Sequence, residues 1–487
     1  MTEHLTHLEN RVDKRICIIG GGANGLALLK VLSETYQVRS GRWTLDAFEE
    51  RGDIGGVWLS APAPRETVPA TPLYESLTTN IPHPVMAYGS FPFPPETPLY
   101  PTAAIVLQYL NAYADSFNLR RYIQLRTRLE GAWWNTEDRL WNVTLSNGKR
   151  ADYDTLLIAN GHYRTPRYPR TPGLTHWAEA GRVMHSVWYR RPDQFANFKK
   201  LVVVGGGPSA RDLCIDLCAV GKLVLQSKRP DDGNELPGSE TYRKVPLIAD
   251  YQANGDIVFE DGVRESGVEF VILATGYEIT FPFLSDPQLV CGLPAVPPPF
   301  PPQLHNSSYH VFPLAKHMFP IQSTFPFCSA AFTGLLVGVA PFPIFEDQAR
   351  AIVRVLEDPA TLDVPAESVV LIERATRIAE TKKSDNPLAV AKAWFRCALD
   401  EGFKYREDLH RFVDPDDTWK IPEPLQWMWE RKTVLRCAWE GVERRGEAEQ
   451  WLRGVGVNGL EDWIELCRRL LATDGGNPGE SRSSSKL

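Results

Sequence analysis

The sequence predicts an α/β protein in which two nucleotide-binding βαβ units are followed by a helical C-terminal extension. Two glycine-rich loops support this prediction, "CIIGGGANG" at residues 17–25 and "VVVGGGPSARD" at 202–212. Each loop follows an apolar strand pattern and precedes a helical one. Residues 345–472 place apolar and Trp residues at helical spacing, which is typical of packed helices. At 487 residues, the chain is long enough for two or more domains.

The composition is that of an ordinary globular protein, with 43% hydrophobic and 23% charged residues. The formal net charge of -7 argues against a general nucleic-acid binder, which would present a basic face to phosphates. The eight cysteines have neither metal-ligand nor disulfide-framework spacing, so we expect no metal site and a reducing compartment. Three prolines interrupt the longest apolar run, residues 325–345, which favours buried strand and loop over a membrane span.

The first glycine loop has the context of a Rossmann unit. Gly20, Gly22 and Gly25 fit the G-x-G-x-x-G pattern, in which the backbone comes close to a pyrophosphate at a helix N-terminus. The next predicted strand, "WTLDAFEE", places Glu49 where a carboxylate accepts hydrogen bonds from ribose hydroxyls. Because Glu49 lacks the cation that a 2′-phosphate needs, FAD or NAD is favoured over NADP at this loop.

The second glycine loop has the same context but a different residue chemistry after its next strand. Its pattern is the G-x-G-x-x-A variant, formed by Gly205, Gly207 and Ala210. The strand "KLVLQSKRP" then supplies a hydroxyl and two cations, Ser227, Lys228 and Arg229. These groups suit a 2′-phosphate, which prefers charge-assisted donors; the alternative for the two cations is solvated surface charge. The two loops therefore predict FAD at the first and NADPH at the second.

Two dinucleotide sites predict hydride transfer from one cofactor to the other. A disulfide reductase would then need a redox-active cysteine pair. Cys214 and Cys218 are four residues apart on a predicted helix rather than in a C-x-x-C motif, and Cys214 is expected to pack in the core. With no thiol relay, oxygen is the expected electron acceptor.

Several longer segments carry a family resemblance. They are "FEERGDIGGVW" (48–58), "LYESLTTNIPHPVMAYGSFPFP" (73–94), "LIANGHYRTPRYP" (157–169), "GRVMHSVWY" (181–189) and "LATGYE" (273–278). In these segments and in their order, the chain resembles class B flavin-dependent monooxygenases of the flavin-containing monooxygenase family, including fungal members. Gly181, His185 and Tyr189 match the family signature F-x-G-x-x-x-H-x-x-x-[YF]. Its leading aromatic is replaced by Glu179, and Trp177 is the candidate substitute.

The resemblance implies a set of cofactor contacts. The first loop and its acid contribute Gly20, Gly21, Gly22, Ala23, Asn24, Gly25 and Glu49; the second loop and its next strand contribute Gly205, Gly207, Ser209, Ala210, Ser227, Lys228 and Arg229; and the segment between them contributes Val57, Trp58, Thr79 and Asn80. Asn80 is the implied catalytic residue beside the flavin, where its amide would donate to the hydroperoxide or to the ribose of bound NADP; the alternative is an Asn that only forms a turn. His185 and Tyr189 are assigned to domain linkage and cofactor alignment, and the alternative for His185 is a buried histidine without a chemical role.

The resemblance also implies a reaction. NADPH reduces FAD, oxygen adds at flavin C4a, and the hydroperoxide oxygenates a soft nitrogen or sulfur of a small amine, thiol or thioether. Baeyer–Villiger relatives end the signature with Trp, whereas this chain has Tyr189, and Trp188 is out of register by one residue. Heteroatom oxygenation is therefore favoured over ketone oxygenation. A Baeyer–Villiger enzyme and an NADPH-oxidising flavoprotein without an oxygenated product remain the alternatives.

The expected domain organisation is a discontinuous FAD domain with an inserted NADPH domain. Residues 1–177 form the first part of the FAD domain, 178–296 the NADPH domain, and 297–472 the return of the FAD domain with the helical region. The proline-rich stretch 294–303 is the expected return crossing, because it cannot continue a sheet or helix.

The two chain ends carry expectations about location. The first twenty residues lack the apolar core of a signal peptide. Residues 473–487 form a polar tail that ends in Ser485, Lys486 and Leu487, the tripeptide read by the peroxisomal import receptor. We therefore expect a peroxisomal protein and this receptor as a partner. The alternative is an accidental ending, in which case a cytoplasmic location is expected.

Overall fold

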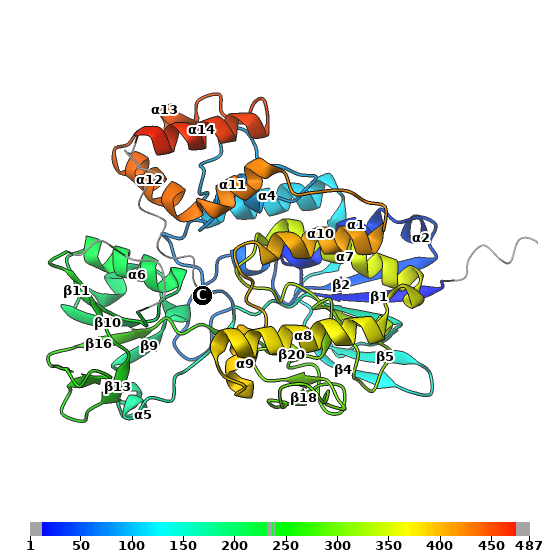
Figure 1. Ribbon diagram of the computed structural model, residues 1–487, viewed down its shortest axis with the longest axis horizontal. Coiled ribbons are helices and arrows are strands. Elements are labelled where there is room, and N and C mark those ends of the chain that lie inside the picture. The colour runs from blue at the N-terminus through cyan, green and yellow to red at the C-terminus, as the bar shows by residue number, and fades with distance from the viewer. Residues whose placement is uncertain (1–11, 231–235, 237–238, 474–487) are drawn as a thin grey trace, which may run out of the picture. The chain divides into compact units, whose positions relative to one another are not determined.

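Each glycine loop belongs to its own five-stranded parallel sheet, and the two sheets are built alike (Figure 1). The computed structural model describes residues 12–230, 236 and 239–473. The strand order is β23-β7-β1-β2-β3 in one sheet and β12-β11-β10-β16-β9 in the other. All neighbouring strands in both sheets run parallel. The predicted α/β class with two Rossmann-like units is confirmed.

The first sheet is centred on β1, whose apolar residues are buried on both faces, as expected for a parallel sheet covered by helices. Its strands are β1 (Lys14–Ile19), β2 (Trp43–Phe48), β3 (Ile123–Gln124), β7 (Thr155–Ile158) and β23 (Ala330–Phe332). The first glycine loop joins β1 to helix α1 (Ala23–Ser33), and α1 packs against α7 (Pro341–Glu357). The order strand, loop, helix, strand is the one that the sequence predicts.

Smaller elements complete this part of the fold. One small antiparallel sheet contains β4 (Leu129–Asn135), β5 (Leu140–Leu145) and β6 (Arg150–Tyr153). A second contains β18 (Val290–Cys291), β19 (His305–Asn306) and β20 (Val311–Phe312), with β18 parallel and β20 antiparallel to β19. A third is the antiparallel pair β21 (Leu314–Ala315) and β22 (Phe319–Pro320). The further helices are α2 (Tyr36–Arg39), α3 (His83–Met86), α4 (Ala103–Ser116), η1 (Gly56–Trp58), η2 (Leu119–Tyr122), η5 (Phe327–Ser329) and η6 (Pro359–Thr361).

The second sheet is centred on β10, and the second glycine loop joins it to α6. Its elements are β9 (Val183–His185), β10 (Lys200–Val204), α6 (Pro208–Ala219), β11 (Leu223–Ser227), β12 (Tyr242–Val245) and β16 (Phe270–Leu273). Around it lie β8 (Thr165–Pro166), α5 (Leu174–Glu179), η3 (Ser186–Trp188), η4 (Pro192–Phe195), β13 (Ile248–Tyr251), β14 (Ile257–Phe259), β15 (Arg264–Glu265) and β17 (Tyr277–Glu278).

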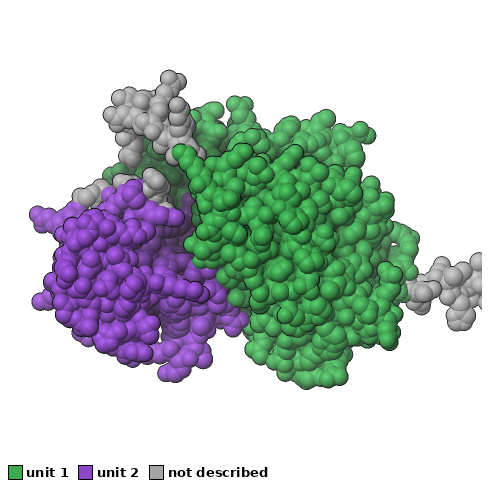
Figure 2. All heavy atoms as spheres, turned by 60° about the horizontal axis from the view of Figure 1, so that its bottom comes forward, with its two compact units in different colours: residues 1–56, 81–161, 279–487 green, residues 57–80, 162–278 purple. Residues whose placement is uncertain are grey.

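The chain divides into two compact units that differ in extent from the expected domains (Figure 2). The second unit comprises residues 57–80 and 162–278, and the first unit comprises the rest. The chain passes back into the first unit at 278–279, so the proline-rich stretch 294–303 lies inside that unit and is not the crossing. Residues 57–80 were expected in the first domain; they join the second unit because their side chains pack into its core, as Tyr74 does.

The C-terminal region is helical, as the sequence predicts. Its helices are α8 (Val364–Lys382), α9 (Pro387–Ala393), α10 (Glu401–Val413), α11 (Glu423–Glu430), α12 (Lys432–Arg444), α13 (Ala448–Leu452) and α14 (Leu460–Thr473). Trp394, Trp429, Trp439 and Trp463 are buried, in agreement with the expected core packing. Among the described residues, no helix is both long and apolar enough to cross a membrane.

Candidate cofactor and active site

The two glycine loops begin with the same close packing. Gly20 has a φ of +110°, and a Cβ there would lie 2.6 Å from the Ala159 carbonyl oxygen. Gly205 has a φ of +140°, and a Cβ there would lie 2.4 Å from the Ala274 carbonyl oxygen. Only glycine therefore fits at the first position of either loop, where the chain turns from strand to helix.

The helix that follows each loop starts without a side-chain cap. The N-cap residues are Gly22 for α1 and Gly207 for α6, and neither offers a side chain to the first N–H groups. Uncapped N–H groups at a helix N-terminus favour an anion, both as hydrogen-bond donors and through the helix dipole. A Cβ on Gly207 would meet nothing within 4 Å, so this loop has open space beside it. Both loops fit a diphosphate.

Glu49 lies directly beside the first loop. Its carboxylate accepts hydrogen bonds from the backbone N–H groups of Gly21 and Arg51, each at 2.8 Å. Glu49 is 5% exposed, and burial raises the pKa of its carboxyl group, although both backbone bonds act in the opposite direction. The carboxylate is thus fixed in orientation at the end of β2, which suits an acceptor for ribose hydroxyls.

The other first-unit candidates lie around the same loop. Gly21, Ala23 and Gly25 are buried, and Asn24 donates its side-chain amide to the Thr333 hydroxyl at 2.8 Å. The Asn24 side-chain oxygen is buried and has no hydrogen-bond partner among the described residues. A buried acceptor without a hydrogen bond destabilises the fold unless a ligand or a water molecule donates to it. The side-chain oxygen of Asn24 therefore suits a contact with a bound cofactor.

The second loop places Lys228 where the first places Glu49. The N–H of Gly20 donates to the Phe48 carbonyl, and that of Gly205 to the Ser227 carbonyl, both at 2.9 Å. The residues that come next are Glu49 and Lys228, so the acid of one unit is replaced by a cation in the other.

The three residues predicted for the 2′-phosphate have different environments. Lys228 is 1% exposed, which excludes solvated surface charge for this residue, whereas Arg229 is exposed. The Ser227 hydroxyl is buried and donates to the Pro246 carbonyl at 2.9 Å, so, contrary to the prediction, its proton is not left to donate to a 2′-phosphate. Ser209 and Ala210 lie in the first turn of α6, as the loop pattern predicts.

Val57, Trp58, Thr79 and Asn80 come from the ends of one segment, residues 57–80, which we call the strap. The Val57 carbonyl accepts a hydrogen bond from the Thr71 hydroxyl at 2.6 Å. Thr79 is buried, while Asn80 is exposed, and its side chain has no hydrogen-bond partner within the described part of the chain. The amide of Asn80 is thus available to a ligand.

His185 of the signature is a buried, neutral residue in the structure. Its Nδ1 accepts from the Val187 N–H at 3.1 Å, so Nε2 carries the proton and donates to the Gly276 carbonyl at 3.0 Å. Burial lowers the pKa of His185 to about 4. Since both ring nitrogens are engaged with the backbone, the arrangement offers no proton transfer and instead holds β9 against the "LATGYE" turn.

The remaining signature positions supply a turn glycine and buried aromatic side chains. Gly181 has a φ of +71° in the turn after α5. Trp177 is 1% exposed and donates its indole N–H to the Gln252 carbonyl at 3.0 Å, whereas Glu179 is exposed. Trp177 therefore supplies a buried aromatic ring near the position where Glu179 departs from the signature. Tyr189 is fully buried, and its hydroxyl donates to Asp216 at 2.7 Å.

Two supporting residues are absent from the residues that the sequence predicts. Gln226 is buried and donates its amide to the Gly205 carbonyl at 2.9 Å, while Tyr242 donates to the Gln226 side-chain oxygen at 2.6 Å. This pair holds the second glycine loop. A glutamine inside the apolar strand "KLVLQS" is the one sign that a buried polar partner is needed.

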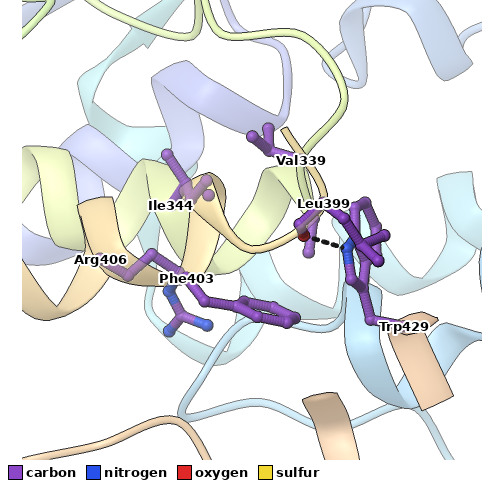
Figure 3. A pocket seen from close by; sticks show the side chains of 8 residues that line it. Val339, Ile344, Leu399, Phe403, Arg406 and Trp429 are labelled. Atoms are coloured by element: carbon purple, nitrogen blue, oxygen red, sulfur yellow. Dashed lines mark hydrogen bonds between the residues drawn. The ribbon is translucent and has the colours of Figure 1, made fainter. Parts of the chain in front are cut away.

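The small cavity in the first unit is too small for a substrate (Figure 3). It encloses about 10 Å³, room for about one water molecule, and is lined mainly by apolar side chains such as Ile344, Phe403 and Trp429. The Trp429 indole donates to the Leu399 carbonyl across its edge at 2.7 Å. We therefore assign it no ligand.

Cys214 and Cys218 do not form a redox pair. All eight cysteines are free, and burial raises the pKa of both thiols above the usual value. Cys214 is buried and Cys218 is half-buried, and a thiol that stays protonated is a poor nucleophile. The part of the chain that the structure describes also holds no cluster of metal-ligating side chains.

Comparison with known proteins identifies the family. The model of the flavin-binding monooxygenase-like family matches residues 13–235 and 234–401. A thiol-specific monooxygenase of Saccharomyces cerevisiae is 31% identical over 349 residues, covering 70% of this chain and 77% of the yeast protein. The flavin-containing monooxygenase FMO GS-OX5 of Arabidopsis thaliana is 29% identical over 371 residues, covering 71% of this chain and 74% of the plant protein.

A solved structure shares the fold. The S-allyl-L-cysteine S-oxygenase of Allium sativum superposes with a TM-score of 0.73 at 23% identity, covering 94% of this chain and 99% of the Allium protein. The two matched loops and their strands are thus those of the family. The chain belongs to the flavin-binding monooxygenase-like family and is a flavin monooxygenase that uses FAD and NADPH.

Proposed function

We propose that the protein transfers one oxygen atom from O2 to a soft heteroatom of a small molecule, with sulfur of a thiol or thioether preferred to nitrogen. For a thioether the balanced reaction consumes one sulfide, one O2, one NADPH and one proton, and it yields one sulfoxide, one water and one NADP⁺. The names of the yeast and Allium proteins, one thiol-specific and one an S-oxygenase, support sulfur.

One observation carries the proposal. Two equivalent loops in one chain are followed by opposite charges, Glu49 and Lys228, at the same structural position. A carboxylate suits ribose hydroxyls, and a cation suits a 2′-phosphate. The pair therefore favours FAD at the first loop and NADPH at the second, and so an enzyme that passes electrons from NADPH to FAD. With Cys214 and Cys218 protonated and unpaired, dioxygen is the remaining acceptor.

The residues of the chain bind and orient the cofactors. When bound, NADPH supplies a hydride and FAD carries its electrons to dioxygen. The N-terminal N–H groups of α1 and α6 would hold the two diphosphates, and Glu49 would accept from a ribose of FAD. Lys228 and Arg229 would face the 2′-phosphate of NADPH. The exposed amide of Asn80 would donate a hydrogen bond to the reacting edge of the cofactors, a fixed dipole that costs no reorganisation.

No general base is needed for the transfer of oxygen to sulfur. The sulfur atom attacks with its own lone pair, so the protein does not have to create the nucleophile. This agrees with His185, whose ring nitrogens are both engaged with the backbone.

The test is product analysis with four probes: methyl phenyl sulfide, 2-mercaptoethanol, N,N-dimethylaniline and cyclohexanone. We expect sulfoxide from the sulfide and oxidised product from the thiol, with one NADPH consumed per product. Oxidation of the amine alone would contradict the sulfur preference. Lactone formation from cyclohexanone, or NADPH oxidation that yields only hydrogen peroxide, would contradict heteroatom oxygenation.

We also propose a peroxisomal location. Ser485, Lys486 and Leu487 lie outside the described residues, and the proposal rests on the tripeptide itself. Deleting Leu487 should move the full-length protein from peroxisomes to the cytosol in fluorescence microscopy. An unchanged distribution on deletion would show that the tripeptide is not used.

A further inference from the structure

The strap, residues 57–80, is built into the core of the second unit. Tyr74 is 7% exposed and packs against Tyr189, with ring centroids 5.6 Å apart, and Leu77 packs against the same core. The chain enters the strap from the first unit at 56–57 and leaves it at 80–81. The two ends of the strap carry Val57 and Asn80, both implied cofactor contacts.

Arg190 fixes the middle of the strap through backbone carbonyls. Its guanidinium donates to the carbonyls of Ala61 at 3.2 Å and Thr71 at 3.0 Å, both in the strap. It also donates to the carbonyls of Val187 at 2.9 Å and Tyr189 at 2.7 Å in the signature segment. Burial lowers the pKa of Arg190, but guanidinium groups stay protonated. One cation therefore joins the strap to the signature at four points, which we call the Arg190 clamp.

Helix α6 fixes the last part of the strap. The hydroxyls of Ser76 and Tyr189 donate to the same Asp216 oxygen, at 2.6 and 2.7 Å. The Tyr74 hydroxyl donates to Asp212 at 2.6 Å. Asp212 and Asp216 are four residues apart and so lie on one face of α6. This helix starts at the second glycine loop, so the segment that ends in Asn80 is bonded to the helix proposed to bind NADPH.

Asn80 itself is not fixed by a side-chain bond. It is exposed, and within the described residues its amide has no partner. The path of the strap backbone therefore determines where the amide lies. A hydrogen-bonded strap keeps the backbone of Asn80 in one place, so that a bound ligand has only the side-chain torsions left to orient.

We propose that Arg190 is a positioning residue of the reaction: through the clamp it holds the strap, and through the strap it places the amide of Asn80. The Tyr189–Asp216–Ser76 contact links the same strap to the NADPH helix. In this proposal the signature residue Tyr189 aligns Asn80 with α6. The inference rests on the proposed function only in assigning Asn80 its role.

The first test measures the clamp without catalysis. Arg190→Met keeps the length of the side chain and removes all four hydrogen bonds. We expect amide exchange in residues 57–80 to rise by about tenfold, because the strap carbonyls of Ala61 and Thr71 lose the donors that hold them and the strap opens more often. Arg190→Lys, which keeps the charge and some donors, should restore part of the protection. Unchanged exchange in the strap of Arg190→Met would overturn the clamp.

The matched control is Arg243→Met. Arg243 is an exposed arginine of the same unit that pairs with Glu265 and does not contact the strap. The Arg243→Met substitution should leave amide exchange in the strap unchanged. Equal loss of protection in both variants would mean that the second unit is destabilised as a whole, and this outcome would also overturn the clamp.

The second test asks whether Arg190 acts through Asn80. The measured quantity is sulfoxide formed per NADPH consumed, in the wild type, Arg190→Met, Asn80→Ala and the double variant. We expect each single change to lower this ratio, with the double variant within about twofold of Asn80→Ala, because residues that act as a unit are not additive. Additive losses would overturn the positioning role.

The failure of the proposed function has a different signature. If the wild type forms no oxygenated product from any probe, the proposed function is wrong, while the exchange experiment still decides the clamp. The FAD content of Arg190→Met should stay within about twofold of the wild type, because the first glycine loop and Glu49 lie in the other unit and only the contacts implied for the strap depend on the clamp. Loss of FAD together with loss of product would contradict an effect confined to the strap.

Discussion

The two nucleotide-binding units share one backbone plan and differ in a few side chains. In both, the first glycine packs on a carbonyl of a neighbouring strand end and donates its N–H to the last residue of the next strand. The residue after that strand is Glu49 in one unit and Lys228 in the other. Both are almost fully buried, so each charge acts in a medium of low dielectric, where it counts for more than at the surface. We propose that this single exchange of charge is what separates the two cofactors on a common scaffold.

The loops also differ at the third conserved position. Gly25 in the first loop leaves room for the Gly20 carbonyl, since a Cβ on Gly25 would lie 1.9 Å from that oxygen. In the second loop the position is Ala210, and the Gly205 carbonyl accepts a hydrogen bond from Gln226. The second loop thus has a side-chain hydrogen bond to the carbonyl of its first glycine.

The largest effect is expected from Gly25→Ala. The added methyl overlaps the Gly20 carbonyl, so the loop must open, and the free energy of unfolding should fall by about 1–3 kcal/mol, the usual cost of overpacking. The protein should purify with little FAD, measured by the ratio of flavin to protein absorbance. Ala210→Gly in the second loop is the reciprocal control and should keep its FAD. A full complement of FAD in Gly25→Ala would show that the third glycine is dispensable.

Glu49→Gln is expected to weaken FAD binding. The amide is uncharged, and loss of a charge-assisted bond of about 1.5–3 kcal/mol corresponds to a rise in the FAD dissociation constant of roughly 10–100-fold. The KM for NADPH, measured with FAD in excess, should stay within about twofold of the wild-type value. Glu130→Gln, an exposed change in the same unit, is the control. A raised NADPH KM with unchanged FAD affinity would contradict the assignment of this loop.

FAD affinity should also depend on pH through Glu49. Burial raises the pKa of this carboxyl group, so protonation begins at a higher pH than in a free glutamate. Ribose binding uses the ionised form; affinity should therefore be constant at high pH and fall as the pH drops through the raised pKa. Fluorescence titration of FAD at decreasing pH measures this. The fall in FAD affinity at low pH should be absent in Glu49→Gln. If it persists in this variant, another group causes it.

The smallest effect is expected from replacing the two cysteines of α6 together. Cys214→Ala with Cys218→Ala removes both thiols from the second unit, and the cavity left by Cys214 should cost about 1 kcal/mol of stability. The rate of flavin reduction by NADPH should stay within about twofold of the wild type, because neither thiol is a thiolate at neutral pH. Loss of flavin reduction would reveal a thiol relay after all.

Much of this fold is predictable from local patterns. The strands, the two loops and the helical C-terminal region follow from runs of β-branched residues, glycine spacing and helical periodicity, all of which act over a few residues. Glu49 is predictable for the same reason, because it lies at a fixed distance from the first loop.

The rest depends on contacts between residues that are far apart in sequence. The strap joins the second unit through contacts such as Tyr74 with Tyr189 and Thr71 with Arg190, and no local pattern marks these distant pairings. The burial of Lys228 and the support of Gly205 by Gln226 are likewise tertiary. Side chains that bond to backbone carbonyls leave no signature in spacing, and this is why Arg190 is absent from the residues that the sequence predicts.

The assignment of FAD to the first loop and NADPH to the second is tested most directly by neutralising Lys228 and Arg229 and measuring the NADPH KM and the FAD content. In Lys228→Gln with Arg229→Gln, the NADPH KM should rise by about tenfold or more, from the loss of charge-assisted bonds to the 2′-phosphate, while FAD content is unchanged. Arg229→Gln alone, at an exposed position, should give a smaller rise in the same direction. Loss of FAD with an unchanged NADPH KM would contradict the account and reverse the assignment of the two loops.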